Sequence, residues 1–425
     1  MKQSLKKIVV SILGRQVRQL RRKHTFKIIG VAGGTGKTST KLAIAQALSK
    51  SQRVRYQEGN YNDIVSVPLI FFGASMPGLL NPIAWAKIFL GNAKQIYGSY
   101  PYDIVVAELG TDGPGQIAAF NKYLELDMAV VTAIVPEHME YFDDLQAVAD
   151  EELSVASYSK QVLYNADLVD AAYIKQLPDG SVSYALKDKG ASYYVANLYH
   201  SAGGFEGDIK HNDAILLHFT HEVVAETQLY SALAAAAVGN ELGLKHTDIL
   251  TGIANIKPVA GRLRRLRGIN GSTIIDDTYN ANPEAVKAAL QALQKIDAPQ
   301  RIALLGNMNE LGNMSAAAHK EIGAACDPSW LHLVVTIGPD AGAHLAPAAS
   351  SNGCTVKTFD NPYDAGEYLQ AKIRAGAVIL AKGSQNKVFA EEAVKLILAD
   401  PEDTAKLVRQ SPYWLKRKAN NFKRK

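Results

Sequence analysis

The sequence has very little cysteine and no long apolar run. Cys326 and Cys354 are its only cysteines in 425 residues. Neither lies in a cluster with metal-ligand spacing, which argues against a disulfide framework and against a zinc site. No apolar run is long enough to span a bilayer, and residues 8–13, the nearest approach, are not followed by a cleavage site. We therefore expect a cytoplasmic protein of two or three globular domains.

Acidic residues are missing from both ends of the chain. Residues 1–24 and 405–425 each carry eight Lys or Arg and no acid, so a net charge of +5 leaves −11 for the body between them. We expect a basic N-terminal arm over 1–25 and a basic C-terminal tail over 401–425, both solvated. Peripheral contact with an anionic membrane surface is the alternative, and no nucleic-acid partner is expected. Residues 8–20 could also form a short helix that packs its apolar face on the protein itself.

A glycine-rich run at residues 30–38, G-V-A-G-G-T-G-K-T, gives the clearest indication of a binding site. The apolar residues 26–29 before it predict a strand, and residues 39–48 after it predict a helix. In that setting backbone N–H groups converge on a polyphosphate, a lysine reaches the terminal phosphates and a hydroxyl binds Mg²⁺. The spacing is a narrower variant of the common P-loop, since Val31 stands where a glycine is usual. We expect ATP and Mg²⁺ here, bound by Gly33, Gly34, Thr35, Gly36, Lys37, Thr38 and Ser39.

Strand-type and helix-type segments alternate along most of the chain, which predicts an α/β fold with mostly parallel sheets. The expected strands are 102–109, 128–135, 161–164, 273–277, 301–306, 333–338 and 377–383. The expected helices are 144–157, 228–242, 283–295 and 316–325. Residues 180–225 alternate and favour an antiparallel patch. The Pro and Gly residues of 257–261 suggest a boundary between a P-loop ATP-binding central domain (26–258) and a C-terminal Rossmann-like α/β domain (259–400).

Polar residues follow several expected strands, at the edge where parallel sheets bind ligands. Glu108 ends one strand and could complete the Mg²⁺ site with Thr38. His138 follows the next strand and is either a second metal contact or an ordinary loop histidine. An oxygen ligand should share that metal, and the acids at 150–152 lie one helix later.

The second domain repeats this pattern. Residues 276–283, D-D-T-Y-N-A-N-P, leave a strand and enter a helix, and their Asp and Asn residues exceed what a helix cap needs. Arg262 lies in a basic run, where it is either a surface residue or a cation that reaches a γ-phosphate held by the other domain. Further candidates at strand exits are Asn307, Glu310, His319, Lys382, Gly383 and Ser384.

Together these segments resemble the Mur ligase family, over residues 26 to about 400. The resemblance rests on GVAGGTGKTST, YNDIVSVP, VVAELGTDGPGQI, PEHMEYF, AGRL, DDTYNANPEAV, LLGNMNELG and AKGS, in the family's order. Its closest branch joins D-alanyl-D-alanine to a UDP-muramoyl-tripeptide. The resemblance implies that ATP converts a carboxylate to an acyl phosphate, which an amine then attacks.

The resemblance also implies residue roles. Lys37, Glu108, His138 and Arg262 would be catalytic, with Thr38, Glu108 and His138 at the metal. The nucleotide would further contact Asp277, Asn280, Asn282 and Gln228, the last of which stands where the family often has Asn. The amine substrate would lie against Asn307, Glu310, Lys382, Gly383 and Ser384.

Two departures from the family stand out. Glu152 occupies the place of a lysine that the family carbamylates with CO₂, and as a carboxylate it could serve the metal directly. Only 25 residues precede the first strand, so the family's N-terminal UDP-sugar-binding domain is not expected. The sequence predicts an ATP-dependent amide ligase acting on a peptidoglycan-precursor carboxylate with D-Ala-D-Ala or a related amine. A folylpolyglutamate-type ligase and a non-catalytic nucleotide-binding protein remain alternatives, and the oligomeric state is open.

Overall fold

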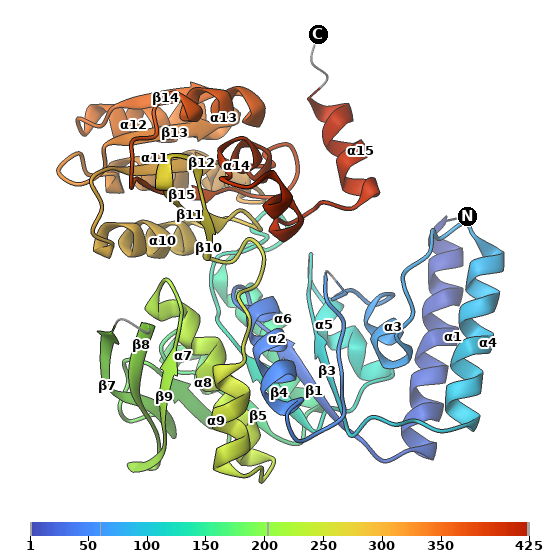
Figure 1. Cartoon of the computed structure of the whole chain (residues 1–425). Coiled ribbons are helices and arrows are strands. Elements are labelled where there is room, and N and C mark those ends of the chain that lie inside the picture. Colours follow the sequence, from blue (N-terminus) through green and yellow to red (C-terminus); the bar gives the residue numbers. More distant parts are fainter. Residues whose placement is uncertain (1, 60, 202–203, 423–425) are drawn as a thin grey trace. The chain divides into compact units, whose positions relative to one another are not determined.

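The computed structural model describes residues 2–59, 61–201 and 204–422 (Figure 1). The chain divides into two compact units. Unit 1 comprises residues 1–222 and 228–257, and unit 2 comprises residues 223–227 and 258–425. Each unit is an α/β structure built around one sheet. The break at 257/258 falls at the Pro and Gly residues noted above.

Among its described residues, unit 1 has nine strands in one sheet, in the order β2-β3-β1-β4-β5-β6-β7-β8-β9. The strands are β1 Lys27–Ala32, β2 Val54–Arg55, β3 Ile104–Glu108, β4 Met128–Val131, β5 Val162–Asn165, β6 Val182–Ala185, β7 Tyr193–Ser201, β8 Gly204–His211 and β9 Ala214–His221. The helices are α1 Lys2–Lys23, α2 Lys37–Leu48, α3 Val67–Phe72, α4 Pro82–Tyr97, α5 Gln116–Ala119, α6 Leu145–Leu153, α7 Ala171–Ile174, α8 Leu229–Glu241 and α9 His246–Ala254, with short 3₁₀ helices η1 Phe120–Lys122 and η2 Ser154–Tyr158. A further 3₁₀ helix, η3 Glu226–Gln228, spans the boundary at 227/228 between the two units.

The first seven strands of this sheet order are parallel, and the last two add antiparallel pairs. The parallel strands β3 and β4 are wholly buried because helices cover both faces, which explains their unbroken apolar sequences. The antiparallel β7–β9 lie within the patch expected at 180–225. Val31 of β1 pairs with Glu108 of β3 and with Val130 of β4. The glycine-rich loop, Glu108 and the segment after β4 therefore leave the sheet at one edge.

The N-terminal residues differ from the solvated arm that the charge pattern suggested. Residues 2–23 form helix α1, and its residues Val9, Leu13, Val17 and Leu20 are buried. Their spacing of i, i+4, i+8 and i+11 places them on one helix face, which packs against α3 and α4. Burial of this apolar face thus outweighs the cost of ordering a highly basic segment, in which Lys6, Lys7, Arg15 and Arg22 stay exposed.

Unit 2 has six strands among its described residues, in the order β10-β11-β15-β12-β13-β14. All pairs are parallel except β10 with β11. The strands are β10 Arg264–Arg267, β11 Thr273–Asp277, β12 Arg301–Gly306, β13 Leu333–Ile337, β14 Val356–Phe359 and β15 Val378–Lys382. The helices are α10 Pro283–Lys295, α11 Ser315–Ala325, α12 Ala346–Ser351, α13 Pro362–Gln370, α14 Glu391–Ile397 and α15 Pro412–Asn421, with short 3₁₀ helices η4 Ile269–Gly271, η5 Gly312–Met314 and η7 Pro401–Lys406 and a π-helical turn η6 Ala341–Leu345.

Helix α10 shows how the local sequence sets an element of unit 2. The Asn282 side chain accepts a hydrogen bond from the N–H of Ala285, and Pro283 occupies the first helical turn. Val286, Leu290 and Leu293 are buried on one face. The cap, the proline and the apolar spacing together fix where this helix begins and which side meets the sheet.

The C-terminal residues up to 422 also form part of their unit rather than a solvated tail. Lys418 of α15 is 1% exposed, and its ammonium lies 2.8 Å from Glu391 Oε1 and 2.6 Å from Glu392 Oε1. A buried lysine needs such partners, and they anchor α15 onto α14. Cys326 and Cys354, also in unit 2, are both buried free thiols. No helix among the described residues combines the length and apolar character needed to cross a bilayer.

Candidate nucleotide and metal site

The glycine-rich loop of unit 1 has the backbone that a phosphate-binding turn requires. Gly33 has φ of 120° and Gly36 has φ of 82°, values that favour glycine. A Cβ on Gly33 would lie 2.5 Å from Thr132 Oγ1, so the loop also approaches β4 closely. That hydroxyl donates a 2.6 Å hydrogen bond to the carbonyl of Thr35. The loop is therefore fixed against the sheet before α2 begins, with Thr35 and the half-buried Ser39 on either side of that start.

Lys37 lies over this loop among carboxylates. Its ammonium donates to the carbonyls of Gly33 and Gly34, and it lies 3.6 Å from Glu137 Oε2 and 4.0 Å from Glu152 Oε1. An ammonium beside the turn is suited to the outer phosphates of a nucleotide. The neighbouring acids hold it there.

Thr38 and Glu108 are in direct contact. The Thr38 hydroxyl donates a 3.1 Å hydrogen bond to Glu108 Oε1. The other oxygen, Oε2, is buried, accepts no hydrogen bond from the described residues, and lies 3.1 Å from the ammonium of Lys41, which is 0% exposed. Sequence reasoning missed Lys41, although its position four residues after Lys37, among the apolar residues of α2, was a usable signal.

Glu152 reaches the glycine-rich loop from α6. Its Oε2 accepts a 2.7 Å hydrogen bond from the N–H of Gly33. Burial raises the pKa of Glu152, while the Lys37 ammonium and the Gly33 N–H partly oppose that shift. The adjacent Glu151 instead accepts hydrogen bonds of 2.6 Å from Gly115 and Ile117, at the start of α5. The two neighbouring acids therefore serve different elements.

The residues present fit a hydrated Mg²⁺ ion rather than a site with many protein ligands. Mg²⁺ usually keeps several waters and takes only one or two carboxylates. The Thr38 hydroxyl and the Glu108 carboxylate that it contacts supply that chemistry. Glu137 Oε2, which is buried and lies 3.6 Å from the Lys37 ammonium, is a further carboxylate oxygen at the glycine-rich loop. No group of three or more His, Cys, Asp or Glu arranged for a metal occurs among the described residues. His138 lies in the loop after β4 with φ of 56°, and its metal role stays a prediction.

Gln228 lies at the N-terminus of α8, where its carbonyl accepts a 2.7 Å hydrogen bond from Ser231 Oγ. Its contact with the nucleotide stays a prediction.

The structure brings together the unit 2 candidates that follow β11 and β15. Asp277 Oδ2 lies 2.6 Å from Lys382 Nζ, which also donates a 3.1 Å hydrogen bond to the carbonyl of Asn280. Both charged side chains are buried. Burial lowers the pKa of Lys382, and the Asp277 carboxylate opposes the shift. The pair therefore ties the segment 277–280 to the end of β15.

The neighbouring Asp276 is wholly buried, and burial raises its pKa to about 6. Its carboxylate accepts hydrogen bonds from the N–H of Gly261 at 3.0 Å and from the Thr278 hydroxyl at 2.6 Å. These donors hold the segment before β10 against the segment after β11.

Arg262 stacks on the aromatic ring of this segment. Its guanidinium carbon lies 4.2 Å from the centre of the Tyr279 ring. Arg409 also binds this segment. It donates hydrogen bonds to the carbonyls of Thr278 and Tyr279 and pairs with Glu391. No sequence signal pointed to Arg409, which lies in the segment expected to be a solvated tail.

Three of the remaining candidates, Asn307, Gly383 and Ser384, make structural contacts within unit 2. Asn307 Oδ1 accepts from the N–H of Ala341 at 2.8 Å, at the start of η6. Ser384 is buried and donates to the carbonyl of Ala281, and a Cβ on Gly383 would lie 2.9 Å from Val388. Their amine-substrate roles, like that of Glu310, stay predictions.

His319 is buried in unit 2 and binds the loop that follows β12. It is buried, its Nε2 accepts from the N–H of Met308 at 3.0 Å, and its Nδ1 bonds the carbonyl of Ser315. Burial lowers its pKa. A neutral His319 therefore fixes the loop after β12.

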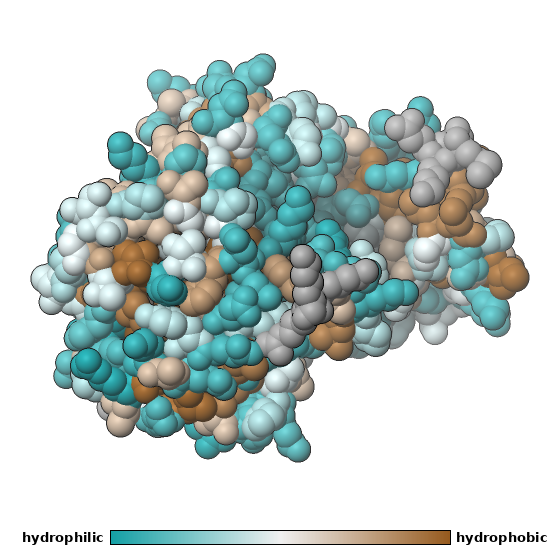
Figure 2. All heavy atoms as spheres, turned by 90° about the horizontal axis from the view of Figure 1, so that it is seen from above, coloured by the Kyte–Doolittle hydropathy of each residue, from teal (hydrophilic) through white to brown (hydrophobic). Residues whose placement is uncertain are grey.

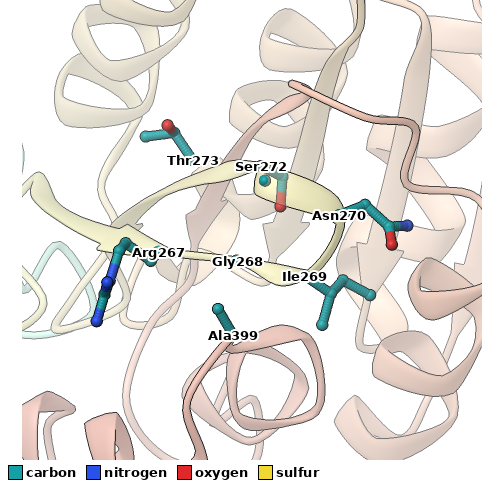
Figure 3. A pocket seen from close by; sticks show the side chains of 8 residues that line it. Arg267, Gly268, Ile269, Asn270, Ser272, Thr273 and Ala399 are labelled. Atoms are coloured by element: carbon teal, nitrogen blue, oxygen red, sulfur yellow. The ribbon is translucent and has the colours of Figure 1, made fainter.

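A surface pocket of unit 2 lies away from these residues. It is lined by Arg267–Thr273 and Ala399, between the turn joining β10 to β11 and the residues after α14 (Figure 3). It sits where β11 begins, whereas Asp277 stands where β11 ends. It is therefore not the candidate site.

Comparisons with known proteins agree on one family. A family model described as the Mur ligase middle domain matches residues 31–239, and one described as the Mur ligase glutamate ligase domain matches residues 261–385. The UDP-N-acetylmuramoyl-tripeptide–D-alanyl-D-alanine ligase of Bacillus subtilis is 27% identical over 385 residues, which cover 88% of this chain and 76% of that protein.

Solved structures show the same fold. The MurF ligase of Thermotoga maritima in complex with ADP matches with a TM-score of 0.75 at 22% identity, covering 96% of this chain and 84% of that one. A folylpolyglutamate synthase of Mycobacterium tuberculosis, complexed with ADP and AMPPCP, matches with a TM-score of 0.65 at 19% identity, covering 92% and 94%. The predicted mixed α/β fold is confirmed.

Proposed function

Because this chain belongs to the Mur ligase family, we propose that it is an ATP-dependent ligase that joins D-Ala-D-Ala, or a related amine, to the carboxylate of a UDP-muramoyl peptide. The observation that carries the proposal is the contact between Thr38 and Glu108 beside a glycine-rich loop that holds Lys37. These groups are what the transfer of a terminal phosphoryl group needs, since that reaction depends on positioning and charge neutralisation.

The reaction has two steps. A carboxylate oxygen of the first substrate attacks the γ-phosphorus of ATP, the bond to the bridging oxygen breaks, and ADP leaves. The amine nitrogen of the second substrate then attacks the acyl carbon, the bond to the phosphate oxygen breaks, and the amine loses a proton as phosphate leaves. The products are an amide, ADP and phosphate.

Residues of unit 1 would serve the first step. The N–H groups of 33–36 and the Lys37 ammonium would bind and orient the phosphates. Thr38 and Glu108 would hold Mg²⁺, with His138 and Glu152 as further candidates, and the ion would offset the charge that develops on the transferred group. Glu137 and Glu152 position Lys37.

Residues of unit 2 would serve the nucleotide and the amine. Asp277 and Lys382 neutralise each other, so we propose that they position the segment 278–280. Arg262 remains the candidate cation for the transferred phosphoryl group. Gly383, Ser384 and Glu310 remain candidates for the amine side.

The proposal is tested by ADP release measured with UDP-muramoyl-tripeptide and D-Ala-D-Ala, supplied together and singly. We expect release that needs both, with an amide product of the summed mass less one water. Lys37→Ala should abolish it, whereas Lys50→Ala, an exposed lysine beyond the same helix, should not. Turnover with a folate and glutamate in place of these substrates would replace our assignment with the folylpolyglutamate-type alternative.

A further inference from the structure

The helices α1 and α4 of unit 1 lie side by side and expose an unusual number of apolar side chains (Figure 1). Among the described residues, thirteen large apolar side chains are exposed, and six belong to α1, α4 or the loop before α4. Such a concentration is uncommon on a protein that has no partner there. The six are Ile8, Met76, Leu80, Ile83, Leu90 and Tyr97.

Three of these residues form a stripe along α4. Ile83, Leu90 and Tyr97 are spaced by seven residues, so they lie on one face of the helix, and their exposed fractions are 70%, 68% and 68%. The opposite face is already used, because Trp85 and Ile96 are buried against the rest of the unit. The stripe therefore does not contribute to the folding core.

The charged residues of α1 and α4 themselves are all positive. The sequence contains no Asp or Glu over residues 1–57 or over 64–102, which span α1, α3 and α4. Lys87 and Lys94 follow Ile83 and Leu90 by four residues and flank the stripe, and Lys23 of α1 lies over the Tyr97 ring at 4.7 Å.

Helix α1 adds further cations next to α4. Arg18 donates to the carbonyl of Lys122, and Arg21 pairs with Asp127, so these two turn toward the unit. Lys6, Lys7, Arg15 and Arg22 are exposed and make no ion pair with the residues that the structure describes. In Figure 2 brown, apolar side chains reach the surface beside teal ones at the right-hand end, where Figure 1 places α1 and α4.

We propose that the α1–α4 surface docks on an anionic lipid membrane. Exposed aliphatic and tyrosine side chains flanked by lysines are suited to the boundary between headgroups and acyl chains, and helices that carry lysines and arginines but no acid are attracted to anionic lipid. A second copy of this chain is disfavoured, because a symmetric contact would bring the same cations together. A nucleic acid would use the cations but would leave the aliphatic stripe unpaired.

The test is co-sedimentation of the full chain with vesicles, at 0.1 M salt and without substrates. We expect binding to phosphatidylcholine vesicles containing about 30% phosphatidylglycerol, little binding to phosphatidylcholine alone, and loss of binding as salt screens the charges. Ile83→Asp/Leu90→Asp should lower the bound fraction at least tenfold. Ile215→Asp, an equally exposed apolar position on β9, should not change it.

Two outcomes would overturn the proposal. One is equal binding of the double variant and the parent chain to anionic vesicles. The other is that the parent chain does not bind anionic vesicles. A dimer in sedimentation velocity that Ile83→Asp/Leu90→Asp dissociates would then assign the surface to a second copy. Unchanged melting temperatures of the variants will show that they fold. Because no substrate is present, the result does not depend on the ligase activity.

Discussion

The backbone N–H of Gly33 donates a 2.7 Å hydrogen bond to Oε2 of Glu152, which lies 119 residues later in the sequence. The other oxygen of that carboxylate lies 4.0 Å from the ammonium of Lys37. A helix that follows the His138 loop thus delivers a buried negative charge directly to the phosphate-binding turn. This placement makes Glu152 the residue of unit 1 whose substitution is most informative.

Glu152→Gln should lower turnover by about a hundredfold, because it keeps the shape but removes a charge that positions Lys37 and is available to Mg²⁺. The measurement is kcat for ADP release at saturating ATP. Asp150→Asn, an exposed acid on the same helix, is the control and should stay within about twofold of the parent. Equal losses in both variants would mean that the effect is not specific to Glu152.

The parent chain should also turn over at the same rate with and without dissolved CO₂. A lysine needs CO₂ to become a carboxylate by carbamylation, whereas Glu152 already is one. The check is the rate in degassed buffer against the rate with added bicarbonate. A clear stimulation by bicarbonate would show that a lysine elsewhere is being carbamylated.

Lys41 and Glu108 should prove energetically coupled. Lys41→Met leaves a buried carboxylate without its cation and should destabilise the fold by about 3–5 kcal/mol. The double variant Lys41→Met/Glu108→Gln should lose less free energy of unfolding than the two single variants together, because neither charge is then buried without its partner. Thermal or denaturant unfolding measures all three, with the exposed Lys50→Met as control. Additive losses would contradict a direct interaction.

Arg409 should act on the nucleotide through the segment 278–280, which it holds by two carbonyls. Arg409→Ala should raise KM for ATP by about tenfold with a smaller change in kcat. The KM for ATP of Arg409→Lys should lie between those of the parent and Arg409→Ala, because a lysine keeps the charge but not the planar guanidinium that pairs with Glu391. The exposed Lys416→Ala is the control. A KM that does not move in Arg409→Ala would leave the residue with a role in stability alone.

Asp276 should make the stability of unit 2 depend on pH. Its folded pKa of about 6 lies above the value of 3.8 expected when unfolded, so the folded state binds the proton more tightly. This proton binding stabilises the folded state fully below pH 3.8, and the stabilisation is lost as the pH rises through 6. Relative to Asp276→Asn, the parent should gain about 1 kcal/mol of stability at pH 5 compared with pH 8. Melting curves of both proteins at the two pH values measure this, and a constant difference would contradict it.

Much of the fold follows from local sequence. β11, β12 and α10 match their expected bounds to the residue, because buried parallel strands are unbroken apolar runs and α10 carries an Asn cap and a proline. Helix α4 was not predicted. Its exposed Ile83, Leu90 and Tyr97 hide the periodicity that a one-faced helix shows.

The site was predictable where neighbouring parallel strands end together. That rule joins Thr38 to Glu108, and the structure shows the contact. The same rule covers Asp277 and Lys382, which end the paired parallel strands β11 and β15, although the sequence does not say that these two strands are neighbours. It could not find the role of Arg409, whose bonds reach back 130 residues to Tyr279. Such contacts depend on how helices and turns fold back over a sheet edge, which no local pattern records.

The central claim is that ATP passes its terminal phosphoryl group to a carboxylate, and that an amine then displaces phosphate from the acyl carbon. The direct test uses a UDP-muramoyl-tripeptide whose reacting carboxylate carries ¹⁸O in both oxygens, with ATP, Mg²⁺ and D-Ala-D-Ala. We expect one ¹⁸O in the released phosphate and the other in the new amide. Unlabelled phosphate, or label in AMP instead, would contradict the account.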